Sequence, residues 1–130
     1  MPKKILVTGG AGFVGTNLIK LLISKTNHNI ISLDDYSSGL KKNHIKSKRI
    51  KYVKAKTVDI DKIIKKPKEI NSIFHFGEFA RIYQSFLKMN DCLESNSVGS
   101  NAVFNFCLKY KIKLIYSATS ASLGNRGNDK

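Results

Sequence analysis

Short apolar runs alternate along the chain with stretches whose apolar residues follow the helical period. The runs typical of buried strands are Ile5–Val7, Ile30–Leu33, Ile50–Val53, Ile73–Phe76 and Leu114–Tyr116. The helix-compatible stretches between them are Phe13–Ser24, Asp59–Lys66, Ile82–Met89 and Val98–Tyr110, and Pro67 is expected to end the second of these. Near-continuously apolar strands that alternate with helices indicate a parallel sheet covered on both faces. The pattern therefore predicts an α/β fold with a doubly wound parallel sheet.

Three spaced glycines lie between the first predicted strand and the first predicted helix. Gly9 lets the backbone turn sharply, Gly12 lets it approach a ligand closely, and Gly15 lets the helix pack near the strand. The helix that follows presents free N–H groups and the positive end of its dipole, which suit a pyrophosphate. Glycines in this context favour a dinucleotide-binding turn.

An acidic residue ends the second predicted strand. Asp34 follows Asn29–Leu33 and lies 19 residues after Gly15, which is close to the spacing of about 20 residues that a dinucleotide site requires. A carboxylate there accepts hydrogen bonds from a free ribose 2′-hydroxyl and repels a 2′-phosphate, so it favours NAD over NADP. The alternative is that the glycines form only a tight turn and that Asp34 is a solvated loop residue.

Length and composition indicate one globular domain. The chain has 130 residues, of which 42% are hydrophobic and 25% charged, values ordinary for a globular protein. No apolar stretch approaches the roughly 18 to 20 residues that span a bilayer, and the N-terminus is typical of a strand rather than of a signal peptide. Cys92 and Cys107 have no second pair, so neither a disulfide framework nor a metal site is indicated. We expect a cytoplasmic protein with reduced thiols.

The net charge of +14 is concentrated in one part of the chain. Twelve Lys and Arg residues lie between Lys41 and Lys68, against only Asp59 and Asp61. Nucleic acid and an anionic membrane surface are the candidate partners for such charge. The basic residues are interleaved with strand and helix patterns and accompany no RNA-binding aromatic motif or helix-turn-helix pattern. We therefore favour a lysine-rich surface that helps to attract nucleotides, with neither nucleic acid nor a membrane as partner.

The glycine turn and the acidic strand end resemble the NAD-dependent epimerase/dehydratase family of extended short-chain dehydrogenases, which has a Rossmann fold. Thr8–Gly15 matches the family's Thr-Gly-x-x-Gly-x-x-Gly segment. Asp34–Gly39 is similar to its Asp-Asn-x-Ser-x-Gly segment around the adenosine ribose, with Asp35 in place of the usual Asn. The resemblance implies NAD contacts by Gly9, Gly12, Phe13, Val14, Gly15, Asp34, Asp35, Tyr36, Ser38 and Gly39.

A second set of family segments follows the third and fourth predicted strands. Val58–Ile60 resembles the family's Gly-Asp-Ile/Leu segment, which implies that Asp59 meets the adenine amino group with Ile60 beside it. The alternative, compatible with the first, is that Asp59 is the N-cap of the helix that follows. Asn96–Ser100 is similar to Asn-Val-x-Gly-Thr, in which the side chain of Asn96 would tie two strand-end loops together near the cofactor.

The end of the fourth predicted strand, Ile73–Glu78, is similar to the family's hydrophobic-His-hydrophobic-Ala-Ala/Gly segment. The resemblance implies cofactor contacts by Phe76, Gly77 and Glu78, although Glu78 stands where the family has a small residue and has Arg81 as an alternative partner. We expect His75 to be a packed strand-end histidine rather than a catalyst.

Ile115–Gly124 resembles the fifth-strand ending of the family. The resemblance places Thr119 on the catalytic Ser/Thr, whose hydroxyl would hydrogen-bond the sugar 4-oxygen, and places Ser117 and Ala118 beside the nicotinamide. The family's 4,6-dehydratases have an acidic residue directly after this Thr, whereas Ser120 and Ala121 follow it here. The segment thus favours an epimerase over a dehydratase.

The family's catalytic Tyr-x-x-x-Lys pair is expected beyond Lys130. Tyr52–Lys56 has the spacing but lies beside the third strand, where its ends would not share a helical face, so we reject it. We expect an N-terminal, NAD-binding Rossmann portion over residues 1–130, truncated after about the fifth strand and inactive alone.

The resemblance implies a parent enzyme that is a homodimer and that oxidises and reduces C4 of a nucleotide sugar, with a UDP-sugar favoured, by transient hydride transfer to bound NAD. The alternatives are a nucleotide-sugar 4,6-dehydratase, another extended short-chain oxidoreductase, or a non-catalytic NAD-binding remnant.

Overall fold

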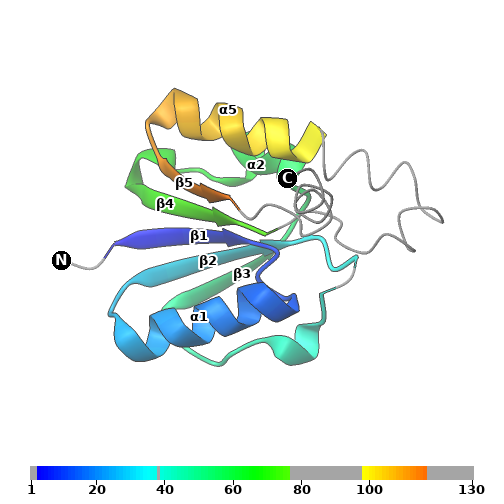
Figure 1. Ribbon diagram of the computed structural model, residues 1–130, viewed down its shortest axis with the longest axis vertical. Coiled ribbons are helices and arrows are strands. Elements are labelled where there is room, and N and C mark those ends of the chain that lie inside the picture. The colour runs from blue at the N-terminus through cyan, green and yellow to red at the C-terminus, as the bar shows by residue number, and fades with distance from the viewer. Residues whose placement is uncertain (1–2, 38, 77–97, 117–130) are drawn as a thin grey trace, which may run out of the picture.

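Five parallel strands form one sheet in the computed structural model, which describes residues 3–37, 39–76 and 98–116 (Figure 1). In sequence order the strands are β1 (Lys4–Thr8), β2 (Asn29–Asp34), β3 (Ile50–Lys54), β4 (Ile70–His75) and β5 (Lys113–Tyr116). Their spatial order is β3-β2-β1-β4-β5, so the direction of winding reverses beside β1. This confirms the predicted doubly wound parallel sheet and places its switch point between β1 and β4, where such sheets bind ligands.

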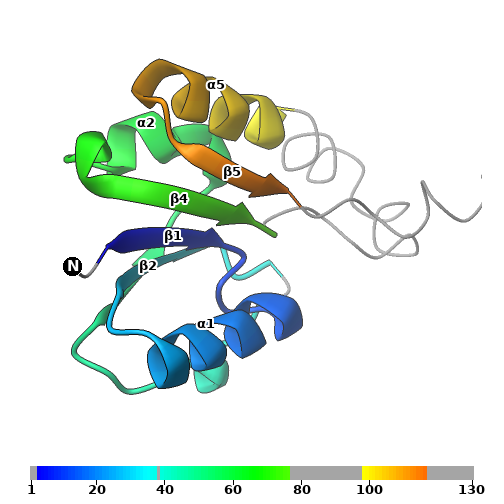
Figure 2. The same ribbon diagram turned by 60° about the vertical axis from the view of Figure 1, so that its left-hand side comes forward.

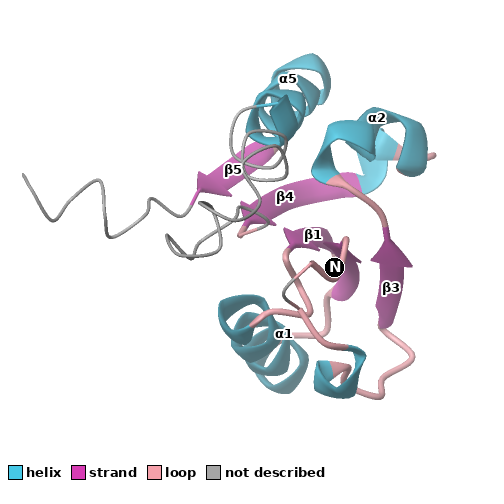
Figure 3. Cartoon of the chain, turned by 90° about the vertical axis from the view of Figure 1, so that its right-hand side faces the viewer, coloured by secondary structure: helices cyan, strands magenta, loops and turns pink. Residues whose placement is uncertain are grey.

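Helices cover both faces of the sheet (Figure 3). Helix α1 (Phe13–Lys25) packs Ile19 against Ile5, Val7 and Ile30 on one face. On the other face, α2 (Ile60–Ile63) and α5 (Ser100–Tyr110) form a larger core with the strands. The two clusters take alternate residues of β1, because successive side chains of a strand point to opposite faces.

The second predicted helix is much shorter in the structure. We expected a helix over Asp59–Lys66, but α2 ends at Ile63, between the 3₁₀ turns η2 (Thr57–Asp59) and η3 (Pro67–Glu69). Pro67 begins η3 rather than ending α2. The backbone of Lys66 is non-helical, with φ −125° and ψ 69°, as expected of a residue that precedes proline. Pro67 also lacks the N–H that would continue the helical hydrogen bonds.

The remaining elements agree with the predicted pattern to within a few residues. Strand β4 begins three residues before the predicted Ile73, and α5 begins at Ser100 rather than at Val98. The predicted helix Ile82–Met89 and Cys92 lie outside the described residues. Cys107 is buried in α5, and burial raises the pKa of its thiol to about 11, so this thiol is unreactive near neutral pH. None of the helices in the described ranges has the length and apolarity needed to traverse a bilayer.

The carboxyl ends of the central strands lie level with one another. Thr8, the last residue of β1, is opposite Leu33 of β2 and His75 of β4. Figure 2 shows the arrowheads of β1, β4 and β5 pointing to the same edge of the sheet, where α1 begins. The predicted glycine turn, acidic strand end and fourth-strand ending therefore converge on one edge.

Candidate functional site: a nucleotide-binding edge of the sheet

The glycine turn connects β1 to α1 through a tight loop. Gly9 has a φ of 71°, a conformation that favours glycine, and its N–H donates to the carbonyl of Leu33 at 2.7 Å. The N–H of Gly12 donates back to the Gly9 carbonyl at 3.1 Å. A Cβ on Gly15 would lie 2.2 Å from the same Gly9 carbonyl oxygen. The first helical turn of α1 therefore packs directly against the glycine loop. The predicted roles of Gly9 and Gly15 in the backbone are confirmed.

The N-terminal end of α1 is open to an anion. Gly12 is its N-cap and provides no side-chain cap, and the first turn of α1 contains no acidic residue. The N–H groups of Phe13, Val14 and Gly15 have no acceptor within the helix, because the first turn of any helix lacks one. The side chains of Phe13 and Val14 are 83% and 55% exposed. These amides and the helix dipole together can bind a phosphate group.

Asp34 is buried at the end of β2 and joins the loop after β2 to the glycine turn. Its Oδ2 accepts a hydrogen bond from the N–H of Ala11 at 2.9 Å, and its Oδ1 accepts one from the N–H of Tyr36 at 2.8 Å. A Cβ on Gly39 would lie 2.7 Å from Oδ2, so the loop returns closely over the carboxylate. Asp34 is therefore not the solvated loop residue of the alternative interpretation.

Burial controls the ionisation of Asp34. Loss of solvent raises the pKa of its carboxyl above the usual 3.8, the N–H groups of Tyr36 and Ala11 act in the opposite direction, and neighbouring Asp35 raises it further. A carboxyl whose pKa is raised by folding stabilises the fold at pH values below its unfolded pKa, and this contribution is lost as pH rises through the folded pKa.

We expect this titration to appear in the free energy of unfolding. As pH rises from below 3.8 through the raised pKa of Asp34, the wild-type chain should lose stability relative to Asp34→Asn, whose side chain does not titrate. Urea unfolding of both proteins across this range measures the difference. A difference that stays constant or changes in the opposite direction would show that burial does not dominate the carboxyl.

The loop after β2 is fixed to the glycine turn through Ala11. The carbonyl of Ala11 accepts hydrogen bonds from the N–H of Leu40 at 3.1 Å and from Nδ2 of Asn43 at 2.8 Å. Asn43 belongs to η1 (Lys41–Asn43) and was not predicted as a site residue. No local motif marks it, because its role depends on a residue 32 positions earlier.

Aromatic rings support the same loop. Tyr36 has a left-handed backbone with φ 63°, and its hydroxyl lies 2.6 Å from Nε2 of His44. His44 stacks on Tyr52 with ring centroids 3.7 Å apart, and the hydroxyl of Tyr52 accepts from the N–H of Ile45. Tyr52 is thus a structural residue of β3, which agrees with rejecting Tyr52–Lys56 as a catalytic pair.

Asp59 and Ile60 follow β3 at the junction of η2 and α2. Asp59 occupies the N-cap position of α2, but its side chain makes no capping hydrogen bond, so the capping interpretation is wrong. Ile60 is fully buried in the core between the sheet and α5. Its side chain is therefore committed to packing, and its predicted cofactor contact is restricted to the backbone.

His75 connects three elements beneath the site. It is fully buried at the end of β4, with Nδ1 2.7 Å from Oγ1 of Thr8 and Nε2 2.9 Å from Oγ of Ser100. Oγ1 of Thr8 also accepts from the N–H of Phe76 at 2.9 Å. His75 is a packed strand-end histidine, as predicted, and it holds the ends of β1 and β4 together with the start of α5.

Gly10 is a site residue that the spacing of the motif did not mark. A Cβ on Gly10 would lie 1.9 Å from Oγ of Ser32, so this glycine lets the turn pass over β2. Ser32 is 1% exposed, and its hydroxyl has no hydrogen-bond partner among the described residues. Such a group has lost water without gaining a partner.

We expect Ser32→Ala to raise the free energy of unfolding by about 1 kcal/mol, because it removes a buried hydroxyl that makes no hydrogen bond. The matched control is Ser100→Ala, which removes a buried hydroxyl bonded to His75 and should lower the same quantity by about 1 kcal/mol. Urea unfolding measures both changes. Equal losses in the two variants would refute the distinction.

The structure brings together one part of the predicted site. Gly9, Gly12, Phe13, Val14, Gly15, Asp34, Asp35, Tyr36 and Gly39 lie in the turn, the start of α1 and the loop after β2, with Phe76 directly after β4. Asp59 and Ile60 follow β3. The predicted residues Ser38, Gly77, Glu78, Asn96, Ser117, Ala118 and Thr119 lie outside the described residues.

Comparison with known proteins gives the same family as the motifs of the sequence. The profile of the NAD dependent epimerase/dehydratase family matches residues 5–129. A dTDP-D-glucose 4,6-dehydratase of Dictyostelium discoideum is 33% identical over 132 residues, covering 95% of this chain and 30% of that protein.

Solved structures of epimerases share the fold. The UDP-glucose 4-epimerase of Thermotoga maritima is 26% identical with a TM-score of 0.76, covering 89% of this chain and 38% of its own. The UDP-N-acetylglucosamine 4-epimerase of Methanobrevibacter ruminantium is 27% identical with a TM-score of 0.80, covering 92% and 39%. The chain thus spans between 30% and 39% of the length of these relatives.

Proposed function

Because this chain belongs to the NAD-dependent epimerase/dehydratase family, we propose that it binds NAD at the carboxyl edge of its sheet and serves the epimerisation of a nucleotide sugar. The observation that carries the first part is the bond between the Asp34 carboxylate and the N–H of Ala11, at 2.9 Å. It places a buried carboxylate and an uncapped helix N-terminus side by side, which are the two groups that recognise a ribose and a pyrophosphate.

The described residues offer partners for the pyrophosphate and for the adenosine part of this ligand. The first-turn amides of α1 would receive the pyrophosphate, with Gly12 leaving room for it, since a Cβ there would meet only the Gly9 oxygen at 3.4 Å. Asp34 would accept hydrogen bonds from the adenosine ribose hydroxyls through the remaining lone pairs of its two oxygens. Asp59 would receive the adenine amino group.

The role of NAD, when bound, is to accept and return a hydride at the sugar carbon. The residues of this chain bind and orient it, and Thr119 is the one proposed to touch the reacting sugar hydroxyl. Ser120 and Ala121 follow Thr119 without an acidic group, which favours epimerisation over water elimination. The relatives include both reaction types, so this sequence difference is the basis of the choice.

A product assay distinguishes the two reactions. The full product of the gene, incubated with NAD and UDP-glucose, should convert the sugar to its C4 epimer, and proton NMR of the anomeric signals measures this conversion. We expect the 130-residue chain alone to bind without turnover. Formation of a 4-keto-6-deoxy sugar from dTDP-glucose, with no C4 epimer from UDP-sugars, would identify a dehydratase instead.

A further inference from the structure

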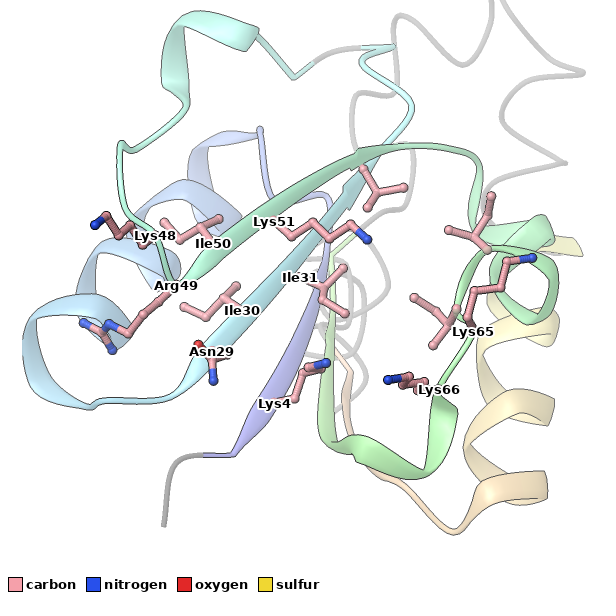
Figure 4. Close-up of a pocket in the computed structure, with 13 residues that line it drawn as sticks. Lys4, Asn29, Ile30, Ile31, Lys48, Arg49, Ile50, Lys51, Lys65 and Lys66 are labelled. Carbon is pink, nitrogen blue, oxygen red and sulfur yellow. The ribbon is translucent and has the colours of Figure 1, made fainter.

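The short crossover between β3 and β4 leaves part of one sheet face uncovered. Helix α2 has only four residues, and beside it lies a cavity of about 450 Å³ (Figure 4). The cavity is lined by the first residues of β1, β2 and β3, namely Lys4, Asn29 and Ile50. It therefore lies at the amino edge of the sheet, opposite the edge that carries Thr8 and Asp34.

The floor of this cavity is aliphatic. Ile31 of β2 and Val53 of β3 line it together with Ile63, the last residue of α2, and Ile64, which follows it. Of these four, only Ile64 is buried, and the other three remain partly exposed. A parallel sheet normally has both faces covered, so this floor presents apolar surface that a ligand of matching shape would remove from water.

The rim of the cavity is cationic. Lys4 and Lys51 lie on the side of the sheet, Lys65 and Lys66 lie across the gap on the connection to β4, and Lys48 adds a further charge (Figure 4). No carboxylate belongs to the described lining of the cavity. Apart from Lys4, these lysines come from the basic stretch between residues 41 and 68, so the fold gathers part of the charge of that stretch around one hollow.

Neighbouring groups already engage part of this charge. Glu69 lies outside the lining and pairs with Lys4 at 2.9 Å and with Lys66 at 3.9 Å. The guanidinium of Arg49 donates to the carbonyls of Ile23, Thr26 and His28 at the end of α1 and after it, so it is structural. Lys65 donates one of its three ammonium N–H groups to the carbonyl of Lys62 at 3.1 Å, which leaves two for a ligand. Lys51 and Lys65 are therefore the rim residues that we assign to an anion.

We propose that this cavity binds an amphipathic anion, a molecule with an aliphatic body and a single carboxylate or phosphate head. The volume lies within the range of about 300 to 1,000 Å³ typical of small-molecule sites. The aliphatic body would cover Ile31, Val53 and Ile63, and the head would lie between Lys51 and Lys65. Nucleic acid is a poorer match, because no aromatic side chain in the described lining offers a base to stack on.

Calorimetric titration of the 130-residue chain with decanoate and with decyl phosphate, each below its micellar concentration, tests this site. Both ligands should bind saturably with one equivalent, and decanol, acetate and inorganic phosphate should each bind at least about tenfold more weakly, because each lacks the head or the body. The stronger of decanoate and decyl phosphate identifies the preferred head group.

A rim variant, a floor variant and a control variant locate the binding. Lys51→Gln combined with Lys65→Gln should weaken decanoate about tenfold or more, whereas Lys20→Gln, on the exposed side of α1, should leave it unchanged. Val53→Phe should fill the cavity and abolish binding while the circular dichroism spectrum is retained. Unchanged affinity in both rim and floor variants, binding of inorganic phosphate as tight as decanoate, or binding only to RNA or to anionic lipid vesicles would overturn the proposal.

Discussion

Replacement of Asp34 by alanine is expected to weaken NAD binding about 100-fold. The carboxylate accepts hydrogen bonds from the N–H groups of Ala11 and Tyr36, and under our proposal it also accepts from the ribose hydroxyls. Hydrogen bonds to charged groups contribute about 1.5 to 3 kcal/mol each, and a loss near 3 kcal/mol corresponds to about two orders of magnitude in affinity. The variant loses the proposed ribose contact. It also loses the hydrogen bond by which Asp34 holds the glycine turn at Ala11. Calorimetry or equilibrium dialysis with NAD measures the change.

A matched control separates this effect from a general loss of charge. Asp61 is an exposed carboxylate that pairs with Lys109 at 3.3 Å, far along the chain from the turn. Asp61→Ala removes the same charge and should change NAD affinity by less than about twofold, as expected for a surface ion pair. If both variants lost affinity equally, the long-range field of the protein rather than the Asp34 geometry would account for binding.

A second large effect is expected at Gly15. A methyl group there would lie 2.2 Å from the Gly9 oxygen and 2.8 Å from Cα of Gly10, and both are backbone atoms that can move only if the turn or α1 moves. We expect Gly15→Ala to lower the free energy of unfolding by about 3 kcal/mol, which is the upper end of the cost of overpacking, and to weaken NAD binding as a consequence. Chemical denaturation measures the stability change.

Gly12→Ala is the informative partner of that variant. Its Cβ would approach only the Gly9 oxygen, at an ordinary 3.4 Å, so we expect the fold to retain its stability. The same methyl group would occupy the space proposed for the pyrophosphate, so NAD affinity should fall. If Gly12→Ala bound NAD as tightly as the wild type, the ligand would not approach the turn as we propose.

The strand and helix patterns predicted the layout of the fold well, because every strand contains a short apolar run, and in β1, β2 and β4 most of that run is buried. The glycine spacing and Asp34 also predicted the central part of the site, since each requirement is local: a tight turn, an open helix end and an acid at a strand end. The actual partners of Asp34 were not predictable from spacing alone. They depend on Ala11 approaching it from 23 residues away.

The failures have two kinds of physical cause, one local and one tertiary. The length of α2 was overestimated because Ile60, Ile63 and Ile64 follow the helical period, whereas the backbone of Ile64 is already extended, with φ −84° and ψ 110°. Aspartate is a residue type that N-cap positions favour, but the side chain of Asp59 makes no capping hydrogen bond. Asn43 and Gly10 were missed because their roles arise from tertiary contacts with Ala11 and Ser32. The roles of Asn43 and Gly10 could not be predicted from spacing, because they depend on chain segments that meet only in the fold.

The most direct test of the proposed site compares NAD with NADP on the wild-type chain by isothermal titration calorimetry. A 2′-phosphate would be placed against the buried carboxylate of Asp34, so NAD should bind at least about tenfold more tightly than NADP. Asp34→Ala should abolish that preference. Equal or tighter binding of NADP by the wild type would contradict the proposal that this edge of the sheet binds NAD and that the Asp34 carboxylate selects it over NADP. A preference for NAD that survives in Asp34→Ala would contradict it as well.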